Sequence, residues 1–499
     1  MWWWSPQDAD WWVTLVLLLV NAAVIIAAAV TIPRKRRPTT ALAWLLTIFL
    51  IPYLGFLIFL LFGTNHLSST RRRKQAEIDK IIRDATKSID HEVVMPSDPD
   101  WIAPLVNLSR ELSSIPVVPG NRITLLSSYD RSFTQIAREI DAAEERVHML
   151  YYTLAYDEVT KPVFDALERA VQRGVSVRVL YDHIGSIRYS GYRQMKRRLK
   201  AIGCEHRPVL SIWPWQGGLQ RIDLRNHRKM VIIDDRTAFM GSQNLIDRRY
   251  HQNASGDAER RWKDLFLQVD GPIAAAVNGV FMSDWFGETN EQLVSPDEMR
   301  PFREPLVEPD DERERSRYLC QLIPSGPGYE HENNLRIFNQ LIYSAKERIT
   351  IASPYLVPDD SLLYAITTAA QRGVEVTLYV SEVGDQFFAF HAQRSYYESL
   401  LEAGVRIRLY RRPYILHSKH LTVDDAVALV GSSNMDMRSF TLNAELMMLV
   451  CSEEFVERMR EVENGYRQRS HELTLEEWRA RPIAGRAFDN IARLTSVLQ

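Results

Sequence analysis

The sequence predicts an α/β protein with two homologous halves, preceded by a two-helix transmembrane hairpin. Three observations support this fold class: two long uncharged segments near the N-terminus, an internal repeat, and alternation of helix and strand patterns within each repeat. The chain has 499 residues, which is long for one domain, and its 46% hydrophobic content is normal for a globular protein. Most of the chain can therefore bury a core.

The membrane segments are expected at residues 11–32 and 41–62, within an N-terminal region 1–62. Each is 22 residues long and carries no charged side chain. At about 1.5 Å per residue, such a helix crosses a hydrocarbon core of about 30 Å. Five tryptophans within the first 12 residues suit the interface of a bilayer. A signal peptide would begin with basic residues, but here Asp8 and Asp10 precede the first segment.

Charges flanking these segments do not fix the orientation. Arg34–Arg37, between the segments, favour a cytoplasmic loop, whereas Arg71–Lys74, after the second segment, favour the opposite arrangement. If both segments cross the membrane, these clusters lie on opposite faces, and the orientations that they favour contradict each other. The side of the membrane that the rest of the chain faces is left open.

The remaining chain is divided by an internal repeat. Residues 170–180 match residues 369–379, and the shared spacing predicts a first half at 116–294 and a second half with a C-terminal tail at 317–499. Residues 63–115 are predicted to be a connector from the bilayer. The stretch 295–316, rich in proline and charge, is predicted to be the linker between the halves.

Each half alternates helix and strand. Residues 175–180 and 374–379 are expected to be strands, and residues 165–173 and 365–372 are expected to be helices that end before Gly174 and Gly373. This order predicts layered α/β sandwiches around a mostly parallel or mixed sheet.

One seven-point motif recurs in both halves at an interval of 190 residues. It comprises a histidine, a lysine two residues later, two adjacent aspartates, and a Gly-Ser-x-Asn turn. The functional members are His227, Lys229, Asp234, Ser242 and Asn244 in the first half, and His417, Lys419, Asp424, Ser432 and Asn434 in the second. A pattern of this length is too specific to arise twice by chance.

The motif predicts chemistry on a phosphate. Alternate residues of a strand face the same side, so each histidine and its lysine are expected to project together. The serines and asparagines would donate to the phosphate. Two facing motifs could then bind one phosphate without a metal or other cofactor, with one histidine as nucleophile and the other as general acid and base.

Two downstream carboxylates, Asp264 and Glu445, are candidates for holding the histidines in different protonation states. Surface ion pairing is the alternative interpretation of these two residues.

The motifs resemble those of the phospholipase D superfamily. Residues 225–234, 353–359 and 431–440, together with the N-terminal hydrophobic segments, resemble bacterial cardiolipin synthases in particular. The resemblance implies two phospholipase D-type halves forming a pseudo-dimer, with His227 as nucleophile. It also implies that Asp234 and Asp424 are structural and that a carboxylate downstream of each motif orients its histidine. Gly241-Ser242 departs from the Gly-Gly pair of many of these synthases.

The implied reaction joins two phosphatidylglycerol molecules into cardiolipin through a phosphohistidine intermediate and releases glycerol. The resemblance also implies a multi-pass protein of the bacterial inner membrane. Three alternatives are considered: a lipid hydrolase, a nuclease, and a membrane scaffold with an inactive site. The net charge of −2 and the hydrophobic anchor disfavour a nucleic-acid partner, and intact motifs disfavour the scaffold. Motif residues alone do not separate transfer from hydrolysis, and they give no oligomeric state.

Overall fold

The computed structural model describes residues 11–34, 36, 38–63, 67–86, 99–211, 213, 221–250, 260–293 and 318–494. The chain folds into two compact units: residues 1–66 with 219–223 form the first, and the rest of the chain forms the second. The predicted linker at 295–316 lies outside the described residues.

The first unit contains three apolar helices: α1 (Trp11–Thr31), α2 (Pro38–Leu50) and α3 (Pro52–Phe62). Among the described residues, only α1 is both long and apolar enough to cross a membrane. The second predicted span, 41–62, is not one helix, because the chain leaves helical geometry at Ile51, with φ −136° and ψ 74°. Pro52 follows, and a proline disfavours helical geometry in the residue before it. A second uninterrupted span is therefore not supported.

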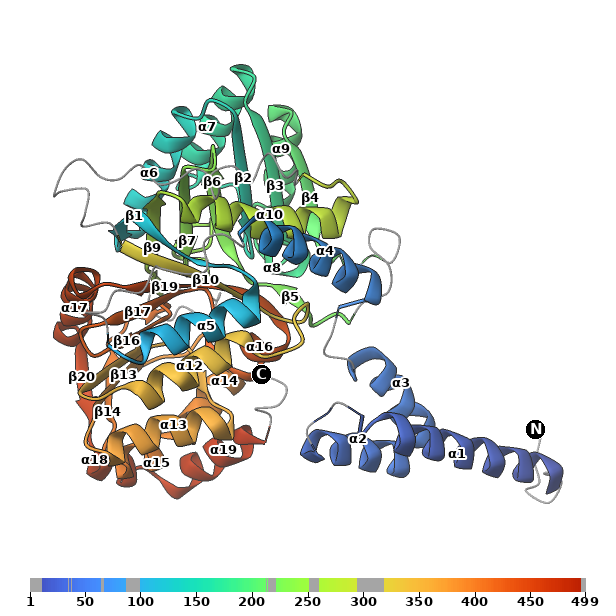
Figure 1. Ribbon diagram of the computed structural model, residues 1–499. Coiled ribbons are helices and arrows are strands. Elements are labelled where there is room, and N and C mark those ends of the chain that lie inside the picture. Colours follow the sequence, from blue (N-terminus) through green and yellow to red (C-terminus); the bar gives the residue numbers. More distant parts are fainter. Residues whose placement is uncertain are drawn as a thin grey trace. The chain divides into compact units, whose positions relative to one another are not determined.

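The second unit is built on one mixed sheet. Its strands follow the order β20-β14-β13-β11-β16-β17-β19-β10-β1-β9-β7-β6-β2-β3-β4, and β5 pairs with β19 (Figure 1). The strands of the first half are β1 (Val117–Leu126), β2 (Arg146–Tyr151), β3 (Ser176–Asp182), β4 (Glu205–Val209), β5 (Arg225–Asn226), β6 (Lys229–Ile233), β7 (Thr237–Gly241), β8 (Arg261–Lys263) and β9 (Phe266–Asp270). Those of the second half are β10 (Tyr318–Ser325), β11 (Arg348–Ala352), β12 (Leu356–Val357), β13 (Glu375–Ser381), β14 (Arg406–Tyr410), β15 (Tyr414–Leu416), β16 (His420–Val423), β17 (Val427–Gly431), β18 (Met435–Asp436), β19 (Asn443–Cys451) and β20 (Ser470–Leu473).

The strand order repeats outward from the centre of the sheet. From β1 the first half runs β9-β7-β6-β2-β3-β4, and from β10 the second half runs β19-β17-β16-β11-β13-β14. Antiparallel pairing of β1 with β10 joins these two series, with Val117 opposite Gln321. The repeat in the sequence therefore corresponds to a repeat in the fold.

Helices cover both faces of this sheet (Figure 1). They are α4 (Ser69–Ala85), α5 (Ile102–Ser113), α6 (Tyr129–Asp141), α7 (Lys161–Gln172), α8 (His183–Ile187), α9 (Tyr192–Ile202), α10 (Ile273–Thr289), α12 (Asn333–Ser344), α13 (Asp360–Gln371), α14 (Phe387–Arg394), α15 (Tyr397–Glu402), α16 (Met437–Thr441), α17 (Glu453–Gln468), α18 (Leu475–Arg479) and α19 (Ile483–Arg493). One hydrophobic core is shared by the halves and includes Val280 of α10 and Met459 of α17. Each half also has its own core on the other face.

The predicted strands and helices at the repeat are confirmed, as β3, β13, α7 and α13. Gly174 and Gly373 follow those helices with φ +89° and +91°, a region in which glycine avoids steric cost. Residues 63–115, predicted to be a connector, also form part of the folded body. Ile82 of α4 and Leu105 of α5 are buried in the cores of the body.

Candidate active site

His227 lies where the chain passes from β5 into β6. The short strand β5 pairs in parallel with β19 of the second half, with Asn226 opposite Ala444. The His227 backbone N–H then donates to the Ala444 carbonyl at 2.8 Å. The histidine of the first motif is thus held by a strand of the second half.

His417 occupies the equivalent position between β15 and β16. Strand β15 pairs in parallel with β8 of the first half, with Leu416 opposite Lys263. The His417 backbone N–H donates to the Lys263 carbonyl at 2.8 Å. The two halves therefore exchange strands at the site, and each histidine depends on its neighbour for its position.

The exchange places each histidine against the carboxylate of the opposite half. His227 Nδ1 lies 2.9 Å and 3.0 Å from the two carboxylate oxygens of Glu445. His417 Nδ1 lies 2.6 Å from Asp264 Oδ1. The expectation that a carboxylate orients the histidine of its own motif is therefore corrected: the pairs are crossed. All four side chains are buried, so the surface ion-pair interpretation also fails.

Both carboxylates are ionised and fixed. Burial raises the pKa of Asp264, but His417 and Lys419 outweigh burial and hold it below its usual value; His227 and Lys229 do the same for Glu445. Because Nδ1–H of each imidazole donates to a carboxylate, each Nε2 is left as the free nitrogen.

Ser242 and Ser432 bind these carboxylates. Ser242 Oγ donates to Asp264 Oδ1 at 2.7 Å, and Ser432 Oγ donates to Glu445 Oε2 at 2.6 Å. Ser439 also donates to Glu445, at 2.9 Å. The hydroxyls predicted to face a phosphate instead position the acids behind the histidines.

Both motif lysines are buried beside their histidines. Lys229 Nζ donates to the His227 carbonyl at 2.5 Å, and Lys419 Nζ donates to the His417 carbonyl at 2.7 Å. Burial lowers the pKa of Lys419 to about 8, and it lowers the pKa of Lys229 well below its usual value. Each lysine also lowers the pKa of the histidine in the opposite half, so the two motifs share one electrostatic environment.

Both histidines are neutral at pH 7. Burial lowers the pKa of His227 to about 4, although Glu445 favours the imidazolium. Burial and Lys419 lower the pKa of His417 to about 3, against the opposing effect of Asp264. A neutral imidazole with a free Nε2 is the form that attacks phosphorus.

The two motif aspartates are not brought to the histidines. Asp234 follows β6 and accepts from the backbone N–H groups of Glu144, Glu145 and Arg146 at 2.8–2.9 Å. Asp424 similarly accepts from residues 346–348 at the end of β16. Five residues of strand, about 16 Å, separate Asp234 from Lys229.

The predicted asparagines are buried near the motifs but are bonded within the protein. Asn244 Oδ1 accepts from the Thr153 N–H at 3.2 Å, and its Nδ2 donates to the Tyr250 hydroxyl at 3.3 Å. Asn434 bonds to the Asp436 side chain.

Two aromatic residues at the site were missed by sequence reasoning. The Tyr152 ring lies edge-on to His227, with centroids 4.8 Å apart, and Lys229 Nζ lies 5.3 Å from the same ring. The Trp262 ring lies edge-on to His417 at 4.6 Å. Trp262 could have been suspected because it stands two residues before Asp264, whereas nothing in the sequence marks Tyr152.

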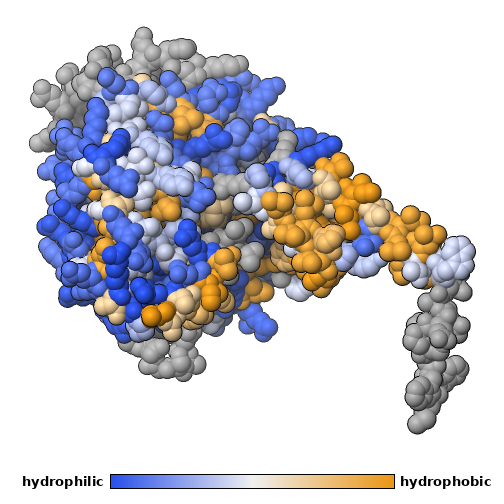
Figure 2. Space-filling model, turned by 90° about the horizontal axis from the view of Figure 1, so that it is seen from below, coloured by the Kyte–Doolittle hydropathy of each residue, from blue (hydrophilic) through white to orange (hydrophobic). Residues whose placement is uncertain are grey.

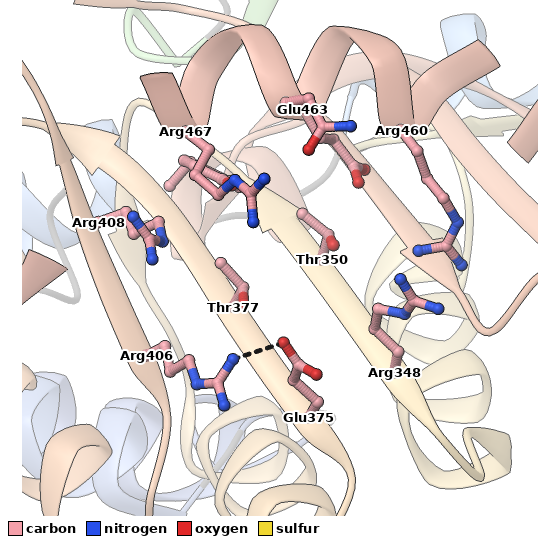
Figure 3. A pocket seen from close by; sticks show the side chains of 11 residues that line it. Arg348, Thr350, Glu375, Thr377, Arg406, Arg408, Arg460, Glu463 and Arg467 are labelled. Atoms are coloured by element: carbon pink, nitrogen blue, oxygen red, sulfur yellow. Dashed lines mark hydrogen bonds and ion pairs between the residues drawn. The ribbon is translucent and has the colours of Figure 1, made fainter. Parts of the chain in front are cut away.

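A separate basic pocket of about 140 Å³ lies between the second-half sheet and α17 (Figure 3). Five arginines line it: Arg348, Arg406, Arg408, Arg460 and Arg467. It lies toward the Asp424 end of β16, whereas His417 precedes the start of that strand. Arg406 pairs with Glu375 at 2.6 Å, and Arg408 pairs with Glu472 at 2.6 Å. The pocket is therefore not part of the histidine site.

Comparison with known proteins agrees with this geometry. The family model "Cardiolipin synthase, PLD-like domain" matches residues 136–285 and 338–464, and "Phospholipase_D-nuclease N-terminal" matches residues 23–63. Cardiolipin synthase A of Proteus mirabilis is 32% identical over 473 residues, covering 93% of this chain and 94% of the relative. Cardiolipin synthase A of Serratia proteamaculans is 33% identical over 465 residues and covers 92% of each chain.

A solved structure shares the fold. The phosphatidylserine synthase of Haemophilus influenzae superposes with a TM-score of 0.57 at 18% identity, covering 79% of this chain and 100% of that chain. The duplicated domain predicted from the repeat is confirmed by the two matched segments. By domain match and by identity over almost its whole length, this chain belongs to the cardiolipin synthase family with phospholipase D-like domains.

Proposed function

We propose that this protein is a phosphatidyltransferase that makes cardiolipin and glycerol from two phosphatidylglycerol molecules through a phosphohistidine. The crossed histidine–carboxylate pairs carry the proposal. They provide two imidazoles with free Nε2 atoms, one from each half, beside two buried lysines. The halves act as a pseudo-dimer in one chain, so a single chain supplies the complete set of groups.

In the first step, His227 Nε2 attacks the phosphorus of one phosphatidylglycerol. The P–N bond forms as the bond from phosphorus to the glycerol oxygen breaks, and protonated His417 gives its Nε2 proton to the leaving glycerol. Glu445 stabilises the positive charge that develops on His227 by accepting its Nδ1–H. His227 is assigned as nucleophile by the family resemblance.

In the second step, the glycerol hydroxyl of another phosphatidylglycerol attacks the same phosphorus. His417, neutral after the first step, takes the hydroxyl proton, and the P–N bond to His227 breaks. The product is cardiolipin, and both histidines return to their starting protonation states. Asp264 stabilises the imidazolium of His417 before the first step and again after the second.

Lys229 and Lys419 supply positive charge to the phosphoryl oxygens in both transition states. The negative charge of a bound phosphodiester stabilises the protonated forms of the side chains around it. Substrate binding therefore raises the pKa of His417 and lets it act as an acid. Tyr152 and Trp262, packed edge-on to the histidines, limit ring rotation and exclude water.

The N-terminal unit is proposed to hold the enzyme at the bacterial inner membrane, where both lipid substrates reside. The apolar surface of α1 supports this location. Phosphatidylglycerol and cardiolipin are the proposed ligands, with no nucleic-acid partner.

The test is to incubate the purified full-length protein with phosphatidylglycerol vesicles and analyse the lipids. Cardiolipin with an equal amount of free glycerol is expected. Phosphatidic acid as the main product would instead indicate the lipid hydrolase and would overturn the synthase. His227→Gln and His417→Gln should each lose at least about 10³-fold in rate, as nucleophile and acid do in triads. His206→Gln, outside the site, is the matched control and should retain full activity.

A further inference from the structure

We propose that residues 38–62 form a re-entrant helical hairpin that enters and leaves the membrane on one side, and that the catalytic body therefore faces the cytoplasm. In this arrangement α1 is the membrane crossing of the described N-terminal unit. The hairpin's partner is the acyl-chain layer of the leaflet next to the body.

The chain reverses at Ile51-Pro52. In a straight helix, residues eight apart are separated by about 12 Å along the axis. Here a Cβ placed on Gly55 would lie only 2.7 Å from the carbonyl oxygen of Thr47. Helix α3 therefore folds back against the end of α2, and glycine allows the close approach.

Contacts farther from the bend keep the same antiparallel register. Trp44 of α2 lies edge-on to Phe59 of α3, with ring centroids 5.4 Å apart. The guanidinium of Arg36, which precedes α2, lies 4.7 Å from the centroid of the same Phe59 ring. Near its C-terminal end, α3 has thus returned to the level of the loop from which α2 began. Figure 1 shows α3 turned away from the axis of α2.

The lengths suit one leaflet. Helices of 13 and 11 residues extend about 20 Å and 16 Å, less than a hydrocarbon core of about 30 Å. Neither helix carries a charged residue, and leucines on both are exposed, including Leu42, Leu54 and Leu60. Figure 2 shows hydrophobic surface gathered over this N-terminal unit.

This geometry resolves the conflict between the basic clusters. Leu67, where the body begins, follows Phe62 by five residues, which reach at most about 18 Å and cannot cross the bilayer. Arg34–Arg37 and Arg71–Lys74 therefore belong to the same side. The other flank of α1, residues 1–10, has two aspartates and no lysine or arginine. The positive-inside rule then assigns the body to the cytoplasm.

The test is cysteine accessibility in intact cells and in opened membranes. Cys204, Cys320 and Cys451 are replaced by serine, and single cysteines are introduced as Ser5→Cys, Thr39→Cys and Asn65→Cys in the full-length chain. A membrane-impermeant maleimide should label position 5 in intact cells, but positions 39 and 65 only after the membrane is opened. Labelling of 39 and 65 from opposite sides would overturn the hairpin, and labelling of both from outside would overturn the orientation.

A paired variant tests the bend itself. Pro52→Leu with Gly55→Leu removes both the helix break and the close approach, so residues 38–62 should become one helix long enough to cross. The residue 65 label should then move to the outside in at least part of the population. Gly485→Leu, where an added Cβ meets nothing within 4 Å, is the matched control and should leave the labelling pattern unchanged. An unchanged pattern in the paired variant would contradict the role assigned to the bend. None of these readouts depends on which lipid reaction the enzyme catalyses.

Discussion

At the residue scale, the site is defined by which carboxylate serves which histidine. His227 bonds to Glu445 and His417 bonds to Asp264, so a histidine and its partner are far apart in the sequence. A carboxylate that accepts Nδ1–H favours the imidazolium and thus raises the pKa of its histidine. The two acids should consequently have separable effects.

We predict that Glu445→Gln and Asp264→Asn change different limbs of the pH profile of kcat, which reports the pKa values of the enzyme with its substrate bound. Glu445→Gln lowers the pKa of the nucleophile His227, so the acid limb should move to lower pH. Asp264→Asn lowers the pKa of the acid His417, so the basic limb should move to lower pH. Both variants should also lose about 10²-fold or more in rate. The opposite assignment of limbs would indicate pairing within each half.

The buried neutral histidines also predict how stability depends on pH. The pKa values of about 4 for His227 and about 3 for His417 lie below the ordinary value near 6.5, so the unfolded chain binds more protons between these limits. The free energy of unfolding should therefore fall as pH drops from about 6.5 toward 4, by on the order of 1 kcal/mol per histidine at pH 5.5.

Denaturant unfolding of the full-length protein in detergent at several pH values measures this effect. The double variant His227→Gln/His417→Gln should show a shallower decline. Some decline should remain, because burial also lowers the pKa of His148 to about 4. Identical slopes for the variant and the natural protein would contradict the proposed neutral state.

At the scale of elements, each motif strand has a chemical end and a structural end. Lys229 begins β6 beside His227, whereas Asp234 ends the strand by binding three backbone N–H groups ahead of β2. Asp234 and Asp424 have φ +51° and +49°, a region that aspartate tolerates better than most residues. The first aspartate of each motif therefore closes the turn that follows the strand.

We predict that Asp234→Ala destabilises the protein by about 1–3 kcal/mol, because it removes the charged acceptor of three backbone N–H groups, of which the Arg146 N–H is half-buried. The rate per folded molecule should change by less than about threefold. Comparison of unfolding midpoints with activity corrected for folded fraction separates these effects. A large loss of rate at unchanged stability would instead place Asp234 in the chemistry.

Sequence reasoning succeeded where the signal is local or repeated. The repeated motif predicted histidines and lysines that the fold buries beside one another, and Gly174 and Gly373 marked the helix ends. It failed for the crossed pairs, because pairing of β5 with β19 and of β15 with β8 joins segments about 150 to 220 residues apart. Pro52, by contrast, was a visible helix breaker within a hydrophobic segment, and the break at Ile51 could have been anticipated.

At the scale of the whole molecule, duplication and strand exchange make one site from two halves. The central pairing of β1 with β10 continues the sheet across both, and each half lends a strand and a carboxylate to the other. Neither half contains a complete histidine–carboxylate pair, which explains why both motifs must occur in one chain or in a dimer.

The central claim is that two histidines from opposite halves act on one phosphorus, with His227 carrying the phosphatidyl group. Mass spectrometry of the full-length enzyme, quenched in alkali soon after mixing with phosphatidylglycerol, tests it most directly. We predict a phosphatidyl adduct on His227 that decays as cardiolipin forms. An adduct on His417 alone would contradict the assignment of the nucleophile, and turnover with no adduct on either histidine would contradict the covalent mechanism.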